Sequence, residues 1–549
     1  MAIRQKIIFS VSSGTEVIFR SILKKSFTAN LFLNFSTKIN IKEDTSLYQG
    51  VVGLEVHAQI NSKSKLFSSS PAEYGSSTNT KVSFFDAALP GTLPVLNKSC
   101  IEAAILTAFA CNCTVNKVST FDRKHYFYPD LPAGYQITQQ FRPLASNGFI
   151  RFVVPGATNI SDSYECISYL KQIQLEQDSG RSLHVKDAKS LVDLNRAGIG
   201  LMELVFEPNL KNGAEAAALV KELICILKRI ETCSCELEEG TFRVDANISV
   251  NKTGDPLGTR TEVKNINSLR YIARAIDYEI ERQIEILKNG GSVVNETRAY
   301  DYTLKKTIFM RDKEILQDYR FMPEPNLPPI RVCDEQDKES YKNVDNVPNI
   351  DEIKRKLPVL PETERSMLMN NYKLPLHKAD KIVQSEGLRN AFEIAASRIN
   401  DCTAICDFFL HVLQSQLNSM KLSFKECGLS GDQVTDIIEL LLLKRISETT
   451  AHDILVMLLN GDNRTAQEIV KEYNWFLISD EKELQGYCEA VISKYFKVAK
   501  KYKNSGKQRY MTTLLIALNE MVNNRASIKD AEAVFKKLIQ ENVKTKKDS

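Results

Sequence analysis

The sequence predicts an α+β protein in which an antiparallel-sheet domain is followed by two all-α domains. Alternating apolar and polar segments, typical of half-buried strands, are frequent up to about residue 320 and nearly vanish beyond it. Seven of the seventeen prolines lie between Phe321 and Pro361, and proline interrupts regular structure. Beyond this boundary apolar residues recur at helical spacing, with a second junction near Cys427 and Gly428.

These boundaries divide the chain into five parts. We expect a targeting or disordered segment at residues 1–45, a catalytic sheet domain at 46–335 and a proline-rich linker at 336–360. A helical domain at 361–426 and a tail domain at 427–549 complete the chain. Within the sheet domain, helical periodicity predicts two helices, at residues 214–230 and 269–288.

Composition excludes several classes of protein. Of 549 residues, 43% are apolar and 26% charged, which is ordinary for a globular chain and unlike a disordered, collagenous or disulfide-stapled one. No apolar run reaches the length of a membrane span, so we expect no membrane association. The twelve cysteines show no paired C-x-x-C spacing, which favours reduced thiols over a structural zinc site.

The N-terminal segment differs in charge from the rest of the chain. Residues 1–42 carry seven basic residues and one acidic residue, although the whole chain is only +4, so the remainder is close to −2. A basic, serine-containing segment without a secretory cleavage pattern is typical of a mitochondrial transit peptide. The alternative is an N-terminal extension without a targeting role.

Three predicted strands carry unusual polar faces. Residues 52–60 alternate strictly, and so do residues 241–250 and 260–265, which we expect to form a hairpin. A strand face exposed to solvent usually carries Thr, Ser or Lys, whereas these faces mix potential metal ligands with potential phosphate contacts. The polar residues are Glu55, His57 and Gln59 on the first strand, Arg243, Asp245 and Asn247 on the second, and Arg260, Glu262 and Lys264 on the third.

Two further carboxylates stand out. Glu203 lies within the apolar segment 201–206, where an unpaired carboxylate would cost several kcal/mol, roughly, and therefore needs a cation or donors. Alternation places Glu176 and Asp178 on one side of the segment 172–178. Either site could be a metal or catalytic position, or a structural Glu–Arg pair.

Known phosphate-binding loops are absent from the sequence. It contains neither G-x-x-x-x-G-K-[ST] nor a G-x-G-x-x-G after a strand, and no kinase glycine-rich loop. If the protein uses ATP, the triphosphate must lie on a sheet face and be held by metal ions and basic side chains.

At this point the sequence resembles a known family, the B subunits of glutamyl-tRNA(Gln) amidotransferases, in its mitochondrial form. The resemblance is carried in order by VGLEVH at 52–57, LPGTLPVLN at 89–97, FDRKHYFYPD at 121–130, GYQIT at 134–138, VDLNR at 192–196, GTFRVDANIS at 240–249, TEVKN at 261–265 and YRFMPEP at 319–325.

The resemblance implies a glutamine-synthetase-like sheet domain and a two-step reaction. Glutamate mischarged on tRNA(Gln) is phosphorylated by ATP on its side-chain carboxylate, and ammonia then displaces the phosphate. The activity is that of a glutamine-hydrolysing glutaminyl-tRNA synthase, a carbon–nitrogen ligase of the mitochondrial matrix. This chain shows no glutaminase signature, so the resemblance implies a heterotrimer with two partners, the glutaminase (A) and the small (C) component.

The resemblance also implies roles for individual residues, with ATP and Mg²⁺ as cofactors. The family's metal ligands match Glu55, His57 and Glu203, and a fourth position, glutamate in the family, is Gln177 in this chain. Catalytic roles are expected for Glu55, His57, Glu176, Glu203 and Lys264. The residues expected to contact the nucleotide or the substrate carboxylate are Arg123, Lys124, Arg243, Asp245, Asn247, Arg260 and Glu262, although Arg123 and Lys124 could instead wall the entrance for the tRNA acceptor end.

The tail contains a local basic segment. Residues 494–509 hold seven basic residues and no acid, interleaved with three aromatic residues. Such a segment is either a solvated helix face or a surface that binds nucleic acid. With the family's YqeY-like tail as a guide, we expect tRNA contacts from Lys497, Lys500, Lys501, Lys503, Lys507 and Arg509.

Two other functions remain open at this stage. In the first, the protein is a non-catalytic tRNA-binding scaffold in which Gln177 marks a degraded metal site. In the second, it is a stand-alone ligase of the glutamine-synthetase type acting on free glutamate, although the helical extension would then have no use.

Overall fold

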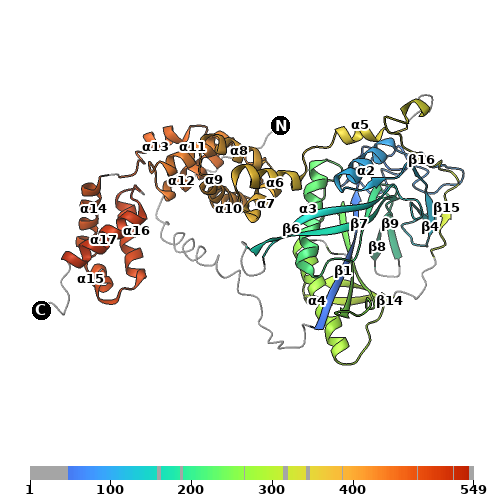
Figure 1. Ribbon diagram of the computed structural model, residues 1–549, viewed down its shortest axis with the longest axis horizontal. Coiled ribbons are helices and arrows are strands. Elements are labelled where there is room, and N and C mark those ends of the chain that lie inside the picture. The colour runs from blue at the N-terminus through green and yellow to red at the C-terminus, as the bar shows by residue number, and fades with distance from the viewer. Residues whose placement is uncertain are drawn as a thin grey trace.

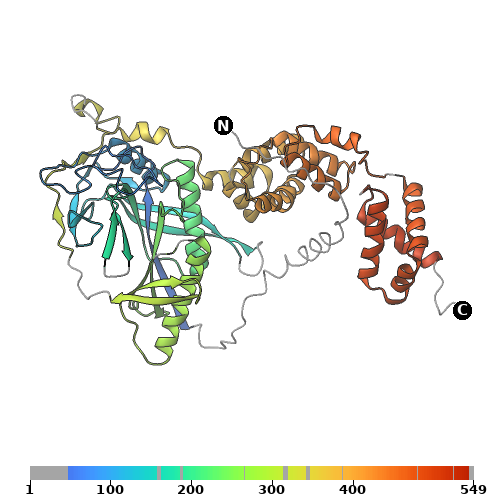
Figure 2. The ribbon, with the colours of Figure 1, turned by 180° about the vertical axis from the view of Figure 1, so that it is seen from behind.

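The structure is a computed structural model that describes residues 47–156, 162–185, 189–264, 266, 268–312, 319–341, 347–385, 387–478, 480–523 and 525–542. The predicted targeting segment at residues 1–45 lies outside the described residues. The described chain is elongated, with a sheet-containing unit at one end and two successive groups of helices beyond it (Figure 1). The same order is seen from behind in Figure 2.

A nine-stranded sheet organises the first unit. Its strands, in spatial order, are β14 (Lys306–Asp312), β13 (Glu296–Asp301), β12 (Thr261–Lys264), β11 (Phe242–Lys252), β1 (Tyr48–Gln59), β10 (Gly200–Phe206), β7 (Tyr164–Gln177), β6 (Ala145–Val154) and β2 (Thr114–Val115). Neighbouring strands are antiparallel except β12 and β13. These two are parallel because helix α4 (Leu269–Lys288) connects them as a crossover. The predicted α+β fold and the hairpin of β11 and β12 are therefore confirmed.

Three smaller sheets complete this unit. Strands β15 (Met322–Pro323), β4 (Asp122–His125) and β5 (Tyr135–Thr138) form one of them, and β5 packs against β7 of the main sheet. The other two are the pair β16 (Ile330–Arg331) with β3 (Val118–Ser119) and the hairpin β8 (Arg181–Val185) with β9 (Lys189–Asp193).

Helices cover the apolar face of the main sheet. Leu54, Val56 and Ala58 of β1 are fully buried with residues of α2 (Lys98–Ala110), α3 (Gly213–Arg229) and α4 in one hydrophobic core. Helices α3 and α4 correspond to the two helices that periodicity predicts. They meet closely at Gly213, where a Cβ atom would lie 2.1 Å from the carbonyl oxygen of Ala273. Because this face is filled, the opposite, polar face of the sheet is left for a site.

The remaining helices bury two separate apolar cores. The first runs from Leu368 to Val470 and the second from Ile478 to Ile539. The sequence-based division at residue 427 stays a prediction for independently folding domains, whereas the apolar cores divide between residues 470 and 478. None of the helices in the described ranges is both long and apolar enough to cross a membrane.

The helices of this part follow the chain in order. They are the 3₁₀ helix η3 (Lys338–Tyr341), α5 (Ile350–Arg355), α6 (Pro361–Tyr372), α7 (Leu376–Gln384), α8 (Leu388–Arg398), α9 (Cys402–Asp407), the π-helix η4 (Phe408–Leu413), α10 (Gln414–Met420), α11 (Gly431–Leu442), α12 (Glu448–Leu459), α13 (Ala466–Glu472), α14 (Glu481–Lys494), α15 (Phe496–Ser505), α16 (Gln508–Met521) and α17 (Ile528–Asn542).

A buried ion-pair cluster joins the sheet unit to the first helical group. Arg365 of α6 donates to Glu222 of α3 at 2.8 Å and to Asp380 of α7 at 3.3 Å, and its side chain is only 4% exposed. Burial raises the pKa of Asp380 to about 6 against the opposing effect of the Arg365 guanidinium. One cation thus compensates two buried carboxylates across the junction.

Replacing Arg365 by Met should therefore destabilise the junction by about 3 to 5 kcal/mol, because two buried carboxylates lose their cation. The free energy of unfolding, measured by urea titration, checks this value. Adding Glu222→Gln and Asp380→Asn to Arg365→Met removes the uncompensated charges and should recover most of the loss. A single variant as stable as the wild type would contradict this account of the junction.

Candidate active site

Strand register gathers side chains from four neighbouring strands on the polar face of the main sheet. His57 of β1 lies opposite Glu203 of β10 on one side and opposite Arg243 of β11 on the other. Glu176 of β7 pairs with Leu201, two residues from Glu203 on the same face. Residues more than 140 positions apart in the chain therefore share one surface.

His57, Glu176 and Glu203 form a compact cluster. One ligand atom from each lies within 4.8 Å of the others, and the His57 Nε2 atom is 3.8 Å from a Glu203 carboxylate oxygen. Glu176 is 3% exposed and Glu203 is 9% exposed. A neutral imidazole and two carboxylates at this spacing are a donor set that fits a divalent cation.

Neighbouring side chains hold the two carboxylates in place. The Thr138 hydroxyl of β5 donates to Glu176 at 3.2 Å, and the Gln174 side-chain amide of β7 donates to Glu203 at 2.6 Å. Gln174 also donates to the Thr138 oxygen at 3.2 Å. The carboxylates are thus oriented by the protein itself.

The titration of the cluster is asymmetric. Burial raises the pKa of Glu203 well above its usual value, and the Glu176 carboxylate adds to this shift. Burial also opposes ionisation of Glu176, but Lys124, a hydrogen bond with Glu203 and His57 outweigh it and lower the pKa of Glu176. Burial lowers the pKa of His57, which favours the neutral imidazole with a free lone pair. Glu203 is therefore the group that would release a proton to a bound cation.

Three cationic side chains surround the cluster. Burial disfavours the ammonium of Lys124 of β4, but Glu176 and Glu203 outweigh this effect and raise its pKa. Lys264 of β12 is 2.8 Å from Asp245 and 3.4 Å from Glu262, and these carboxylates outweigh burial and raise its pKa. Arg243 lies 3.0 Å from Asp178.

These groups line a cavity of about 420 Å³. His57, Lys124, Glu176, Arg243, Asp245 and Lys264 all contribute to its wall. Fixed positive charges and a cation-binding cluster in one cavity can bind phosphate oxygens and a carboxylate side by side.

The predicted residues Glu55, Asn247 and Glu262 lie further along the same face. The Asn247 amide donates to Glu55 at 2.9 Å, and Asn247 pairs with Glu262 across β11 and β12. Glu55 is therefore near the cluster, bonded to Asn247, and is not one of its three central members.

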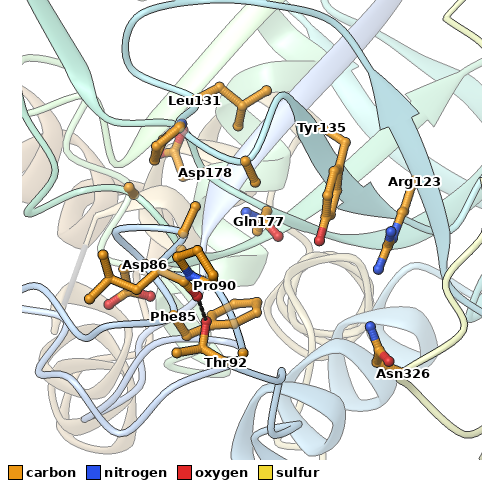
Figure 3. A pocket seen from close by; sticks show the side chains of 17 residues that line it. Phe85, Asp86, Pro90, Thr92, Arg123, Leu131, Tyr135, Gln177, Asp178 and Asn326 are labelled. Carbon is orange, nitrogen blue, oxygen red and sulfur yellow. Dashed lines mark hydrogen bonds between the residues drawn. The ribbon is translucent and has the colours of Figure 1, made fainter.

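Gln177, expected from the resemblance to be a metal ligand, lies on the other side of β7. Its side-chain oxygen accepts from the Ile137 backbone N–H at 3.3 Å. It lines a separate pocket of about 300 Å³ together with Tyr135 and Asn326 (Figure 3). Because side chains of a strand alternate, Gln177 and Glu176 cannot face the same cavity, and the expected role of Gln177 beside His57 is corrected to Glu176.

The same alternation separates Arg123 from Lys124 on β4. Arg123 lies in the pocket of Figure 3, where it forms a bidentate pair with Glu324 at 2.6 and 3.0 Å and stacks over Tyr135. The expected nucleotide contact by Arg123 is therefore not supported by its position. Arg260 is exposed in the loop before β12 and does not line the cavity of His57.

Two residues of the site were not selected from the sequence, and a third had no partner assigned. Gln174 orients Glu203, and alternation with Glu176 could have indicated it. Asp178 pairs with Arg243 and, at 3.5 Å, with Arg196. Arg196 lies in the matched segment VDLNR, which was the available signal for it.

The tail cations divide into two groups. Lys497, Lys501, Lys507 and Arg509 are exposed on α15, α16 and the turn between them, and Lys500 is half-buried. Lys503 donates to the carbonyl oxygen of Gln540 at 3.0 Å, so it also ties α15 to the end of α17.

The fold and the cavity define a class: an enzyme-type sheet domain with a cation-binding cluster and phosphate-binding charges, joined to helical units. Comparison with known proteins is specific. A family model described as the GatB/GatE catalytic domain matches residues 50–338, and one described as the GatB domain matches residues 390–541. The chain belongs to this GatB family.

Similar proteins span almost the whole chain. The B subunit of the mitochondrial glutamyl-tRNA(Gln) amidotransferase from Aedes aegypti is 44% identical over 530 residues, covering 94% of this chain and 99% of that protein. Its counterpart of the same name from Homo sapiens is 43% identical over 481 residues, covering 87% and 86%. The B subunit of the aspartyl/glutamyl-tRNA(Asn/Gln) amidotransferase from Wolbachia pipientis is 40% identical over 464 residues, covering 84% and 92%.

Proposed function

We propose that this protein is the B subunit of a mitochondrial tRNA-dependent amidotransferase, which converts Glu-tRNA(Gln) to Gln-tRNA(Gln). The observation that carries the proposal is the buried His57, Glu176 and Glu203 cluster beside Lys124, on the sheet of a GatB-family chain. The expected mitochondrial location is confirmed by the names of the Aedes aegypti and Homo sapiens relatives.

The reaction needs an activated carboxylate. A free carboxylate is a poor electrophile because hydroxide leaves badly, and conversion to an acyl phosphate by ATP solves this. Phosphoryl transfer then depends on positioning and on neutralising charge at the phosphate oxygens. A Mg²⁺ ion, when bound, would supply part of that neutralisation, and His57, Glu176 and Glu203 are the residues that would hold it.

The chain's own residues account for the rest of the chemistry. Lys124 and Lys264 project into the cavity and would bind the transferring phosphoryl group or the glutamyl carboxylate. Arg243, held by Asp178, would contact the phosphates from the neighbouring strand. Thr138 and Gln174 keep the two carboxylates oriented, so the site needs little reorganisation during the reaction.

Ammonia must come from outside this chain, because the sequence shows no glutaminase signature. We propose that two partners, the glutaminase (A) and the small (C) component, supply it within a heterotrimer. That the protein works within a complex follows from its place in a family of amidotransferase subunits.

The scaffold alternative loses its main support. It depended on Gln177 as a defective metal ligand, but the side chain of Gln177 lies outside the cluster and Glu176 lies within it. The stand-alone ligase is disfavoured by the GatB domain match over residues 390–541.

The experiment that tests the function follows the γ-phosphate. Radiolabelled ATP is incubated with Glu-tRNA(Gln) and the assembled complex, with and without glutamine. The proposal requires labelled acyl phosphate on the tRNA without glutamine, and Gln-tRNA(Gln) with it. Turnover of free glutamate without tRNA would instead support the stand-alone ligase.

The tail surface should contribute to tRNA affinity. Changing Lys497, Lys501 and Lys507 to Gln should lower the slope of log K against log salt by about 2 to 3, because up to three phosphate contacts are lost. Binding of tRNA(Gln) by fluorescence anisotropy across salt concentrations measures the slope. Exposed lysines of the sheet unit provide the control, Lys171 and Lys189 changed to Gln. An unchanged slope in the tail variant would refute the assignment.

A further inference from the structure

A second, smaller pocket of about 160 Å³ adjoins the cavity of the candidate active site. The two share the side chains of Arg181 and Glu239 in their walls. The outer wall of the smaller pocket is the segment 73–76. A ligand that occupies the small pocket could therefore extend past Arg181 to the cluster of His57.

The small pocket has an aromatic platform at its rim. Tyr74 is 58% exposed, and the guanidinium carbon of Arg181 lies 5.7 Å from the centroid of its ring. Arg181 also donates to the Glu239 backbone carbonyl at 3.2 Å, which fixes its position at the boundary of the two pockets. An exposed ring next to a guanidinium can stack a nucleobase and contact a phosphate.

Hydrogen bonds hold the platform rigid. The Asn195 amide donates to the Ser77 carbonyl at 2.7 Å, and the Asn79 amide donates to the Val192 carbonyl at 3.0 Å. In the reverse direction, the Leu194 backbone N–H donates to Asn79 at 2.7 Å. The segment carrying Tyr74 is thus fastened to the strand end that leads into the site, and its ring is presented without an ordering cost.

The charge of the pocket limits what it can hold. Glu73 is paired with Lys81 at 2.8 Å, and Asp193 accepts from the Asn79 and Asn195 backbone N–H groups. Arg196 is occupied by the carbonyl oxygens of Ser179 and Gly180. With Arg181 as the cation left at the rim, the lining suits a nucleoside with a single phosphate better than a triphosphate.

We propose that this pocket receives the 3′-terminal adenosine of the aminoacylated tRNA. Its base stacks on Tyr74, Arg181 contacts the adjoining phosphate, and the aminoacyl group passes Arg181 into the cavity of His57. This inference rests on the proposed function, because it requires an aminoacyl-tRNA substrate. It assigns to Tyr74 and Arg181 the positioning of the substrate, with no part in the bond changes.

A fluorescent tRNA tests the stacking directly. tRNA(Gln) carrying 2-aminopurine at its 3′ terminus and glutamate in a stable amide linkage is mixed with the assembled complex. The wild type should quench the probe, Tyr74→Phe should quench it equally, and Tyr74→Ala should not. The control is Tyr169→Ala, since Tyr169 is comparably exposed (53%) on β7 and should leave quenching intact.

Kinetics with normal Glu-tRNA(Gln) provide the second readout. Tyr74→Ala should raise KM for the tRNA by about 5- to 100-fold, the range for loss of one stacked base, with KM for ATP and kcat little changed. Arg181→Met should also raise KM for the tRNA. A rise in KM for ATP alone would overturn the proposal in favour of the ATP adenine, and unchanged quenching in Tyr74→Ala would overturn it outright.

Failure of the inference is distinguishable from failure of the proposed function. Quenching requires no catalysis, and formation of Gln-tRNA(Gln) by the wild type is measured separately. Normal amidation with normal quenching in Tyr74→Ala would reject only the pocket assignment. Quenching without any amidation would reject only the reaction.

Discussion

Replacing Glu176 by Gln should lower the rate of phosphorylation of Glu-tRNA(Gln) in the assembled complex by about 10²- to 10³-fold, the range for removing one fixed electrostatic group from an active site. Glu176 carries the lowered pKa of the cluster and therefore supplies its negative charge, whereas the pKa of Glu203 is raised. A glutamine keeps the shape but removes that charge. The rate of γ-phosphate transfer from labelled ATP, measured at several Mg²⁺ concentrations, checks the effect.

Two variants on the same strand serve as controls. Glu165→Gln removes a carboxylate at the exposed far end of β7 and should have the rate of the wild type. Gln177→Glu adds a charge next to Glu176 but on the opposite face, and should not restore Glu176→Gln. Rescue of Glu176→Gln by Gln177→Glu would show that the two side chains reach one site, contrary to the structure.

Replacing Lys124 by Met should be similarly severe, with a loss of about 10²-fold or more in the same rate. The Lys124 ammonium compensates Glu176 and Glu203, and its absence raises the pKa of Glu176. The cluster would then keep a proton in place of a cation, so affinity for a divalent ion should fall as well. Electron paramagnetic resonance titration with Mn²⁺ measures that affinity independently of turnover.

The matched control is Lys171→Met, which removes an exposed lysine from β7. It should leave both the rate and the Mn²⁺ affinity unchanged. Thermal unfolding of each variant shows whether the fold persists. A folded Lys124→Met complex with normal rate and normal Mn²⁺ affinity would remove Lys124 from the site.

Local sequence patterns predicted much of the polar face but not its assembly. Alternation placed Glu55 and His57 together on one strand and Arg243 and Asp245 together on another, and the structure keeps both pairs on one face. The same rule, applied to residues 174–178, puts Gln174, Glu176 and Asp178 on one side. Gln177 was assigned from the resemblance instead, and the period of two explains why it lies in the other pocket.

The sequence could not decide which of Arg123 and Lys124 faces the cavity. Adjacent residues on a short strand always point to opposite sides, but the outward and inward sides of β4 depend on what it packs against. Pairing of β4 with β5, and packing of β5 on β7, turn Lys124 toward Glu176 and leave Arg123 with Glu324. Those contacts are between distant segments.

The sequence by itself determined the succession of elements, the two long helices of the sheet unit, the polar and apolar faces of its strands and the family. These depend on interactions between residues a few positions apart, which the order of the residues records. Only the tertiary structure decided the register that sets His57 opposite Glu203 and brings Glu176 and Lys124 beside them. Register between strands separated by more than a hundred residues is fixed by the packing of the whole sheet on its helices, and no local pattern contains that information.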